Sequence, residues 1–178
     1  MSKSQSGAIM RKALFSALSA ILIAGCTHSP IPEGYSGPTA QISDSQTRRG
    51  STSADFFYVS AINGVSIDNS LDATVRTNED RGFAMDPVVL TRKIPAQPAT
   101  FAIKGRTHYA APILELANPV YQVSGTTSFA PVPNSTYVVK GVLGENYSAV
   151  WIADAVTGAV MGQKVEVRGS SSLGILEK

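Results

Sequence analysis

An all-β fold, an antiparallel β-sandwich of about seven or eight short strands, is the architecture that this sequence predicts. Between residues 54 and 168, short runs rich in β-branched and aromatic residues alternate with turn signals at intervals of about ten residues. No run in this part keeps a helical period for more than about two turns. A length of about 115 residues suffices for two sheets facing across one core. A partly open barrel is the alternative.

The first predicted hairpin turns at Asn63-Gly64. The run 56–62 (FFYVSAI) is rich in aromatic and β-branched residues and leads directly into this dipeptide. Asn-Gly favours a type I′ turn, because both central residues of that turn need a positive φ. Residues 65–67 are the expected returning strand, and the polar stretch 68–86 is expected to form a long, mostly irregular loop.

A second strand pair is expected from residues 88–94, between Pro87 and Pro95, and residues 100–109. Gly105 inside the latter run indicates a bulge or a close contact with the backbone. Residues 112–116 fit either one short helical turn or a strand.

The C-terminal half predicts four further strands with clear turns between them. The turn at residues 154–158 begins with Asp, whose side chain accepts hydrogen bonds from turn amides, and ends with Gly, which takes a positive φ. Either Trp151 or Ile152 faces the core, since neighbouring residues of a strand point opposite ways. The strands are expected at 120–130, 136–143, 149–153 and 160–167, and the core at Phe57, Phe101, Phe129, Tyr137, Val139 and Trp151 or Ile152.

The N-terminal residues have the order of an export signal. A short basic segment precedes the apolar run Ala13–Ala24, which has the length of a signal-peptide core. A helix that spans a bilayer needs about 20 apolar residues, and no later stretch reaches that length.

Ile23-Ala24-Gly25-Cys26 then resembles the lipobox of bacterial lipoproteins, in which an aliphatic residue and two small residues precede an obligatory cysteine. The resemblance implies cleavage between Gly25 and Cys26. It also implies a diacylglyceryl group on the Cys26 sulfur and an acyl chain, such as palmitate, on the new amino group. Several acyl chains hold a protein on a membrane essentially permanently. In enterobacteria-like species, Asp after the cysteine retains a lipoprotein at the inner membrane, so Thr27 favours the periplasmic leaflet of the outer membrane.

The mature chain is divided by composition into three parts. Residues 26–53 are dominated by Pro, Gly, Ser and Thr and are expected to form a lipidated, flexible tether. Residues 54–168 are the predicted β-sandwich, and residues 169–178 are expected to be a frayed tail. The body resembles the transthyretin-like or PEGA-like β-sandwich modules of bacterial lipoproteins, through the run from Ile94 to Gly105 and through Asn63-Gly64. Those modules usually carry Gly at the turn where this chain has Gln97-Pro98.

Charge and cysteine content exclude several classes of function. The chain has 15 basic and 13 acidic residues, but three of the bases precede Cys26, which leaves 12 bases against 13 acids. A body so close to neutral has no electrostatic footprint for nucleic acid. Cys26 is the one cysteine, so neither an internal disulfide nor a cysteine zinc cluster can form.

No metal site, cofactor site or catalytic residue is expected. His28 and His108 are about eighty positions apart, without the spacing of metal ligands. His108 with Arg106 and Tyr109 is read as the solvated face of a strand, with a small anion-binding patch as the alternative. Five acidic residues are read as part of a solvated loop: Asp68, Asp72, Glu79, Asp80 and Asp86.

The function predicted from these features is that of a membrane-anchored lipoprotein of the cell envelope. Its sandwich would be a non-catalytic module that binds or scaffolds another envelope component, most simply a protein. A cryptic hydrolase that uses His108 and a small-ligand carrier in the periplasm are the alternatives. A convergent Ser–His–acid cluster would favour the hydrolase, and a large apolar cavity the carrier.

Overall fold

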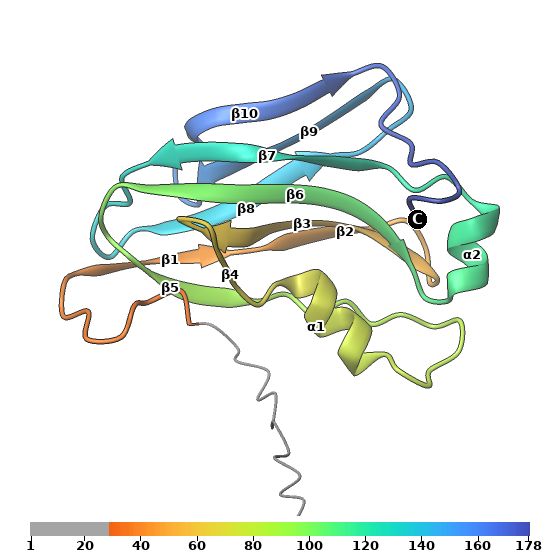
Figure 1. Cartoon of the computed structure of the whole chain (residues 1–178), viewed down its shortest axis with the longest axis horizontal. Helices are drawn as coiled ribbons and strands as arrows, with labels where there is room; N and C mark the ends of the chain where they lie inside the picture. The colour runs from red at the N-terminus through yellow and green to blue at the C-terminus, as the bar shows by residue number, and fades with distance from the viewer. Residues whose placement is uncertain (1–28) are drawn as a thin grey trace, which may run out of the picture.

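A computed structural model describes residues 29–178 and folds them into two facing β-sheets (Figure 1). Strands hold 47% of the described residues and helices 9%, and all strand pairs but one are antiparallel, which confirms the all-β sandwich. The predicted signal peptide, the predicted cleavage site and Cys26, the predicted site of lipidation, lie outside the described residues. The elements are β1 (Thr39–Ser43), β2 (Ser45–Arg48), β3 (Ser53–Ile62), β4 (Val65–Ser66), α1 (Ser70–Thr77), β5 (Thr91–Pro95), β6 (Ala99–Tyr109), α2 (Pro112–Ala117), β7 (Gln122–Phe129), β8 (Thr136–Val142), β9 (Tyr147–Asp154) and β10 (Val160–Arg168).

One sheet has the strand order β10-β9-β8-β1-β5, and the other has the order β2-β3-β6-β7 with β4 paired to β3. The facing sides of the two sheets enclose the main core, in which Phe101, Tyr137, Val139 and Ile152 are buried as predicted. Phe57 is also buried there, and Phe129 is partly buried against the same cluster.

The prediction of a flexible tether over residues 26–53 is wrong for the part that forms strands β1 and β2. β1 lies inside its sheet, between β5 and the parallel strand β8, and it buries Ala40 and Ile42. A strand with a partner on each side satisfies its backbone hydrogen bonds, so two buried apolar side chains suffice to hold a segment rich in Ser and Thr. After Asp44 the chain passes directly into β2, in the other sheet.

The expected pairing of residues 88–94 with 100–109 is wrong. β5 pairs with β1, whereas β6 pairs with β3 and β7 in the opposite sheet. The connection through residues 96–98 therefore crosses from one sheet to the other and is not a hairpin turn. The Asn63-Gly64 hairpin is confirmed, with φ values of 50° and 80°.

The stretch 68–86, expected to be mostly irregular, contains α1. Asn69 caps this helix by accepting a hydrogen bond from the amide of Asp72. α1 packs on the outer face of β3, where Leu71 and Met85 join Phe56 and Tyr58 in a second apolar cluster. β3 is thus buried on both faces, which explains the four consecutive large apolar residues at 56–59. Residues 112–116 fitted either a helical turn or a strand, and in the structure residues 112–117 form the helix α2.

The C-terminal strands β7 to β10 match the predicted ones to within a few residues. Of the two candidates for the core, Ile152 is buried, whereas Trp151 points outward, with the Lys164 Nζ 4.2 Å from its ring centroid. Residues 169–178 are not frayed. The Leu173 amide donates to the Val120 carbonyl at 2.8 Å, and the Lys178 ammonium donates to the Asn118 carbonyl at 2.7 Å.

Gly105 has the close contact that its place inside a strand indicated. A Cβ at this position would lie 3.1 Å from the ring of Phe57 and 3.2 Å from the side chain of Val123. Glycine therefore lets core side chains approach the β6 backbone.

Candidate functional site

Three places in the described structure gather polar or cavity-lining residues: the end of β6 around His108, the crossing between the sheets at Asp44, and one end of the sandwich near residue 29. Each is a candidate site, and each contains contacts or a cavity that the sequence alone did not predict.

His108 forms an imidazole–carboxylate pair with Glu115 of α2. The His108 Nδ1 lies 2.7 Å from the Glu115 Oε1, and the Arg106 guanidinium lies 3.9 Å from the other carboxylate oxygen. Arg106 also donates to the Gln122 side chain at 2.9 Å, and the Tyr109 hydroxyl donates to the Pro119 carbonyl. Glu115 therefore offsets the positive charge that an anion patch would need. No sequence pattern pointed to Glu115 as this partner, because it is the helix α2 that places Glu115 back over β6.

The electrostatics of Glu115 follow from these contacts. Partial burial raises the pKa of Glu115, but the hydrogen bond and charge of His108 and the charge of Arg106 lower it by more, so the pKa lies below its usual range. Glu115 is an acceptor that is ionised over a wide pH range.

A cavity of about 330 Å³ lies between this pair and the end of α1. The hydroxyl groups in its lining belong to Thr74 and Tyr109, and no serine lines it. The Thr74 Oγ1 donates to the Ser70 carbonyl at 2.7 Å and accepts from the Val88 amide at 2.8 Å. This hydroxyl is thus engaged in holding α1, and the cavity lacks the Ser–His–acid arrangement that would favour a hydrolase.

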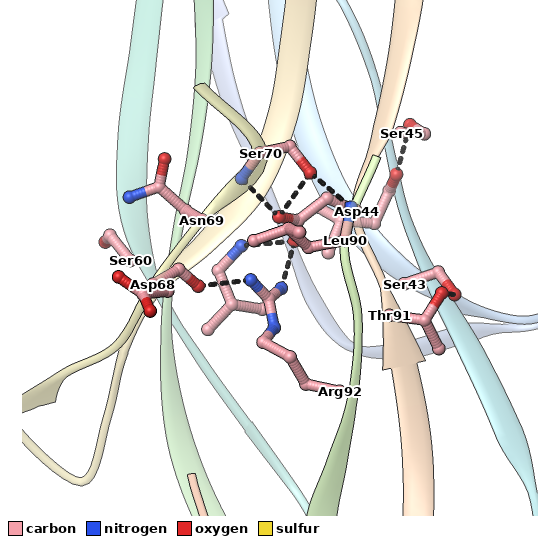
Figure 2. Close-up of polar contacts among 12 residues, drawn as sticks. Ser43, Asp44, Ser45, Ser60, Asp68, Asn69, Ser70, Leu90, Thr91 and Arg92 are labelled. Atoms are coloured by element: carbon pink, nitrogen blue, oxygen red, sulfur yellow. Dashed lines mark hydrogen bonds and ion pairs between the residues drawn. The ribbon is translucent and has the colours of Figure 1, made fainter. Parts of the chain in front are cut away.

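Asp44 is the centre of a buried polar network at the crossing from β1 to β2 (Figure 2). Its carboxylate contacts the Arg92 guanidinium and accepts two hydrogen bonds of 2.9 Å from Ser70, one from the amide and one from the hydroxyl. It also accepts from the Val59 amide at 3.2 Å, and Arg92 donates to the Asp68 carbonyl.

The environment of Asp44 is almost dry. Its side chain is 0% exposed and that of Arg92 is 9% exposed. Burial raises the pKa of Asp44, while Arg92 and the hydrogen bonds from Ser70 act in the opposite direction. The carboxylate bonds to Ser70 of α1, Val59 of β3 and Arg92 of β5, and it thereby ties these elements to the end of β1.

The acidic residues of the loop 68–86 are dispersed. Asp72 bonds with the Asn69 side chain at the start of α1, and Asp86 pairs with Arg81 at 2.8 Å. Among residues 29–178, no three His, Cys, Asp or Glu side chains converge as metal ligands would.

The third candidate site is a cavity of about 470 Å³ at one end of the sandwich, which we call the end pocket. Its inner surface is apolar and includes Ile62, Ile67, Ile94 and Phe101, which also belong to the main core. The polar side chains in its lining are Ser29, Glu33, Asn63 and Gln97.

One wall of the end pocket is formed by Ser29–Glu33, the first residues that the structure describes. In Figure 1 this segment, drawn in orange, runs beside β5 at the end of the sheets opposite α2. Glu33 is the one charged residue of the lining, which contains neither Lys nor Arg. No sequence signal pointed to this cavity, because its lining comes from three segments that lie far apart in the sequence.

Neither α1 nor α2 is long and apolar enough to cross a bilayer, and the described residues contain no other helix. Comparison of the chain with protein-family models, with curated proteins and with solved structures finds no match.

Proposed function

We propose that this chain is a lipoprotein of the bacterial cell envelope whose β-sandwich is a non-catalytic binding module held at the membrane surface. The observation that carries the proposal is the short distance along the chain between the lipobox cysteine and the folded body. Ser29 already lines the end pocket, and it follows Cys26 by three residues.

Three residues span at most about 10 Å when fully extended. A lipid on Cys26 would therefore hold the end-pocket side of the sandwich close to the headgroups, with little freedom to diffuse away. Confinement of this kind raises the effective concentration toward partners in the same membrane, so modest affinity is sufficient for binding. Thr27 after the cysteine favours the periplasmic leaflet of the outer membrane as the place of anchoring.

A small-ligand carrier is the second candidate, and the end pocket favours it. Ligand sites are typically apolar cavities of about 300–1,000 Å³ with a few polar groups at the rim, and the end pocket has these properties. A hydrolase would have to use the His108–Glu115 pair, beside which Thr74 and Tyr109 are the hydroxyl residues of the lining.

The test uses the full-length gene expressed in its host. Mass spectrometry of the mature N-terminus should give a diacylglyceryl-modified Cys26, and fractionation should place the protein with the outer membrane. Chemical cross-linking in intact cells should join it to a discrete envelope component. A mature chain that begins elsewhere, or that carries a free thiol at Cys26, contradicts the proposal. Hydrolytic activity that His108→Ala abolishes, with the fold intact, would establish the enzyme instead.

A further inference from the structure

We propose that the end pocket holds one fatty acyl chain of the lipid attached to Cys26 of the same molecule. This inference rests on the proposed lipidation and adds an occupant for the pocket. Three observations carry it: the apolar interior, the distance to the cysteine, and the charge of the lining.

The interior is suited to a hydrocarbon chain. Ile94 and Phe101 are fully buried at its base, and Ile62 and Ile67 are each 6% exposed. These four residues also belong to the main core, so an acyl chain in the pocket would extend that core between the sheet ends.

The covalent connection makes the protein's own lipid the nearest candidate. Ser29 is part of the pocket wall and Cys26 is three residues away. An acyl chain on that cysteine therefore meets the pocket by an intramolecular step, at an effective concentration in the millimolar range or above.

Charge distinguishes this lipid from other acyl compounds. A diacylglyceryl thioether and an N-acyl amide are both uncharged. A free fatty acid or an anionic phospholipid carries a net negative charge, which would meet Glu33 and no cationic side chain in the lining. Bringing such a charge to the rim without a partner is costly. The neutral lipid on Cys26 matches the lining better.

One acyl chain in the pocket is compatible with anchoring. A cysteine that carries a diacylglyceryl group and an N-acyl chain has three chains, so two stay in the bilayer, enough for stable attachment. The body is then fixed with its end pocket toward the membrane and α2 away from it.

The experiment uses the intact lipidated protein from cells fed a fatty acid with a diazirine in its chain. After purification in detergent and irradiation, peptide mapping should show the N-terminal lipopeptide joined to peptides that contain residues 62–67 or 94–101. Ala99→Phe fills the pocket and should remove most of these cross-links. Ala159→Phe, on the exposed β9–β10 turn, is the matched control and should keep them.

A second measurement covers the case in which Ala99→Phe does not fold. Hydrogen exchange at the pocket-lining amides should be slower in the lipidated protein than in a secreted Cys26→Ser form. An unmodified Cys26 would overturn both the proposed function and this inference. A lipidated Cys26 that cross-links to the detergent or elsewhere on the surface, with unchanged exchange, would overturn the inference alone. Labelling of the pocket by fatty acid not attached to Cys26 would also overturn it and would favour an exchangeable carrier.

Discussion

At the scale of single residues, Asp44 has more structural consequences than its position in a polar segment suggests. It lies where the chain leaves one sheet for the other, and its carboxylate bonds to Ser70, Val59 and Arg92. A buried ion pair adds little net stability compared with an apolar replacement, but removal of one partner leaves the other charge buried and unpaired.

We therefore expect Asp44→Asn to lower the free energy of unfolding by about 3–5 kcal/mol, because the Arg92 charge loses its counter-ion in a dry environment. Urea unfolding followed by circular dichroism measures the change. Arg81→Ala is the control. It breaks a pair whose side chains are 50% and 73% exposed, so the expected loss is below about 1 kcal/mol. Equal effects of the two variants would mean that the network at Asp44 does not hold the sheets together.

Glu115 predicts a dependence of stability on pH. Its pKa in the folded protein lies below the usual value, so its ionised form stabilises the fold above the unfolded-state pKa of about 4.3. That contribution is lost as the pH falls through the lower, folded-state pKa. The gap in unfolding free energy between the wild type and Glu115→Gln should be about 1 kcal/mol or less near pH 5.5 and should shrink near pH 3.

Urea titrations of both proteins at the two pH values check this expectation. Glu145→Gln removes one negative charge from an exposed turn and controls for the change in net charge. A gap that stays constant between pH 5.5 and pH 3 would mean that the pair with His108 does not contribute.

Single residues were predictable where their chemistry acts locally. Asn63-Gly64 determines its own turn, and the absence of a side chain at Gly105 leaves room for the Phe57 ring. The choice between Trp151 and Ile152 was not predictable, because both neighbours are large and apolar and only the register with β8 decides which is buried. The partner of His108 was also not predictable from local sequence. Glu115 lies seven positions later, and it contacts His108 only because α2 folds back over β6.

At the scale of elements, the two helices differ in how they begin. α1 has a side-chain cap at Asn69, whereas Ala111 at the start of α2 makes no such hydrogen bond. Asn69→Ala should cost about 1 kcal/mol of stability, and Ala111→Asn should add up to about 1 kcal/mol. Thermal and urea unfolding of both variants give the two signs. A loss on Ala111→Asn would show that α2 begins elsewhere or that the new side chain meets a steric obstacle.

Strand existence was easier to predict than strand partnership. Apolar alternation and turn residues identified β6 to β10 nearly to their ends, because both signals are local. β1 and β2 were not predicted as strands, because their polar composition resembles that of a linker. Their stability comes from pairing with strands that are distant in the sequence. The placement of β5 and β6 in opposite sheets depends on the whole topology, which no local pattern encodes.

At the scale of the whole molecule, the early start of the fold changes the expected relation between the body and the membrane. A flexible segment up to residue 53 would let the sandwich sample a layer of tens of ångströms above the leaflet. With β1 beginning at Thr39 and Ser29 already at the end pocket, the described structure leaves a far shorter connection to Cys26. Under the proposed lipidation, distance from the membrane and orientation are both restricted.

This restriction leads to a prediction about linker length. Insertion of 20 Gly/Ser residues after His28 should leave folding and lipidation unchanged, since the added chain lies before the pocket wall. It should weaken the intramolecular approach of the Cys26 lipid to the end pocket by about twentyfold, on the −3/2 power of length. It should also complement a deletion strain at native expression less well than the native form does. The same insertion between Val156 and Thr157, where Val156 is 90% exposed, is the matched control.

A secreted Cys26→Ser form with an ordinary signal peptide completes the series, because it removes the anchor without altering residues 29–178. If the protein acts at the membrane surface, activity should fall from the native form to the long-linker form and again to the secreted form, while circular dichroism and unfolding curves coincide. Full complementation by the secreted form would mean that anchoring is incidental. Complementation by the long-linker form alone would mean that attachment matters and close apposition does not, so the pocket and its acyl chain would have no part in the function.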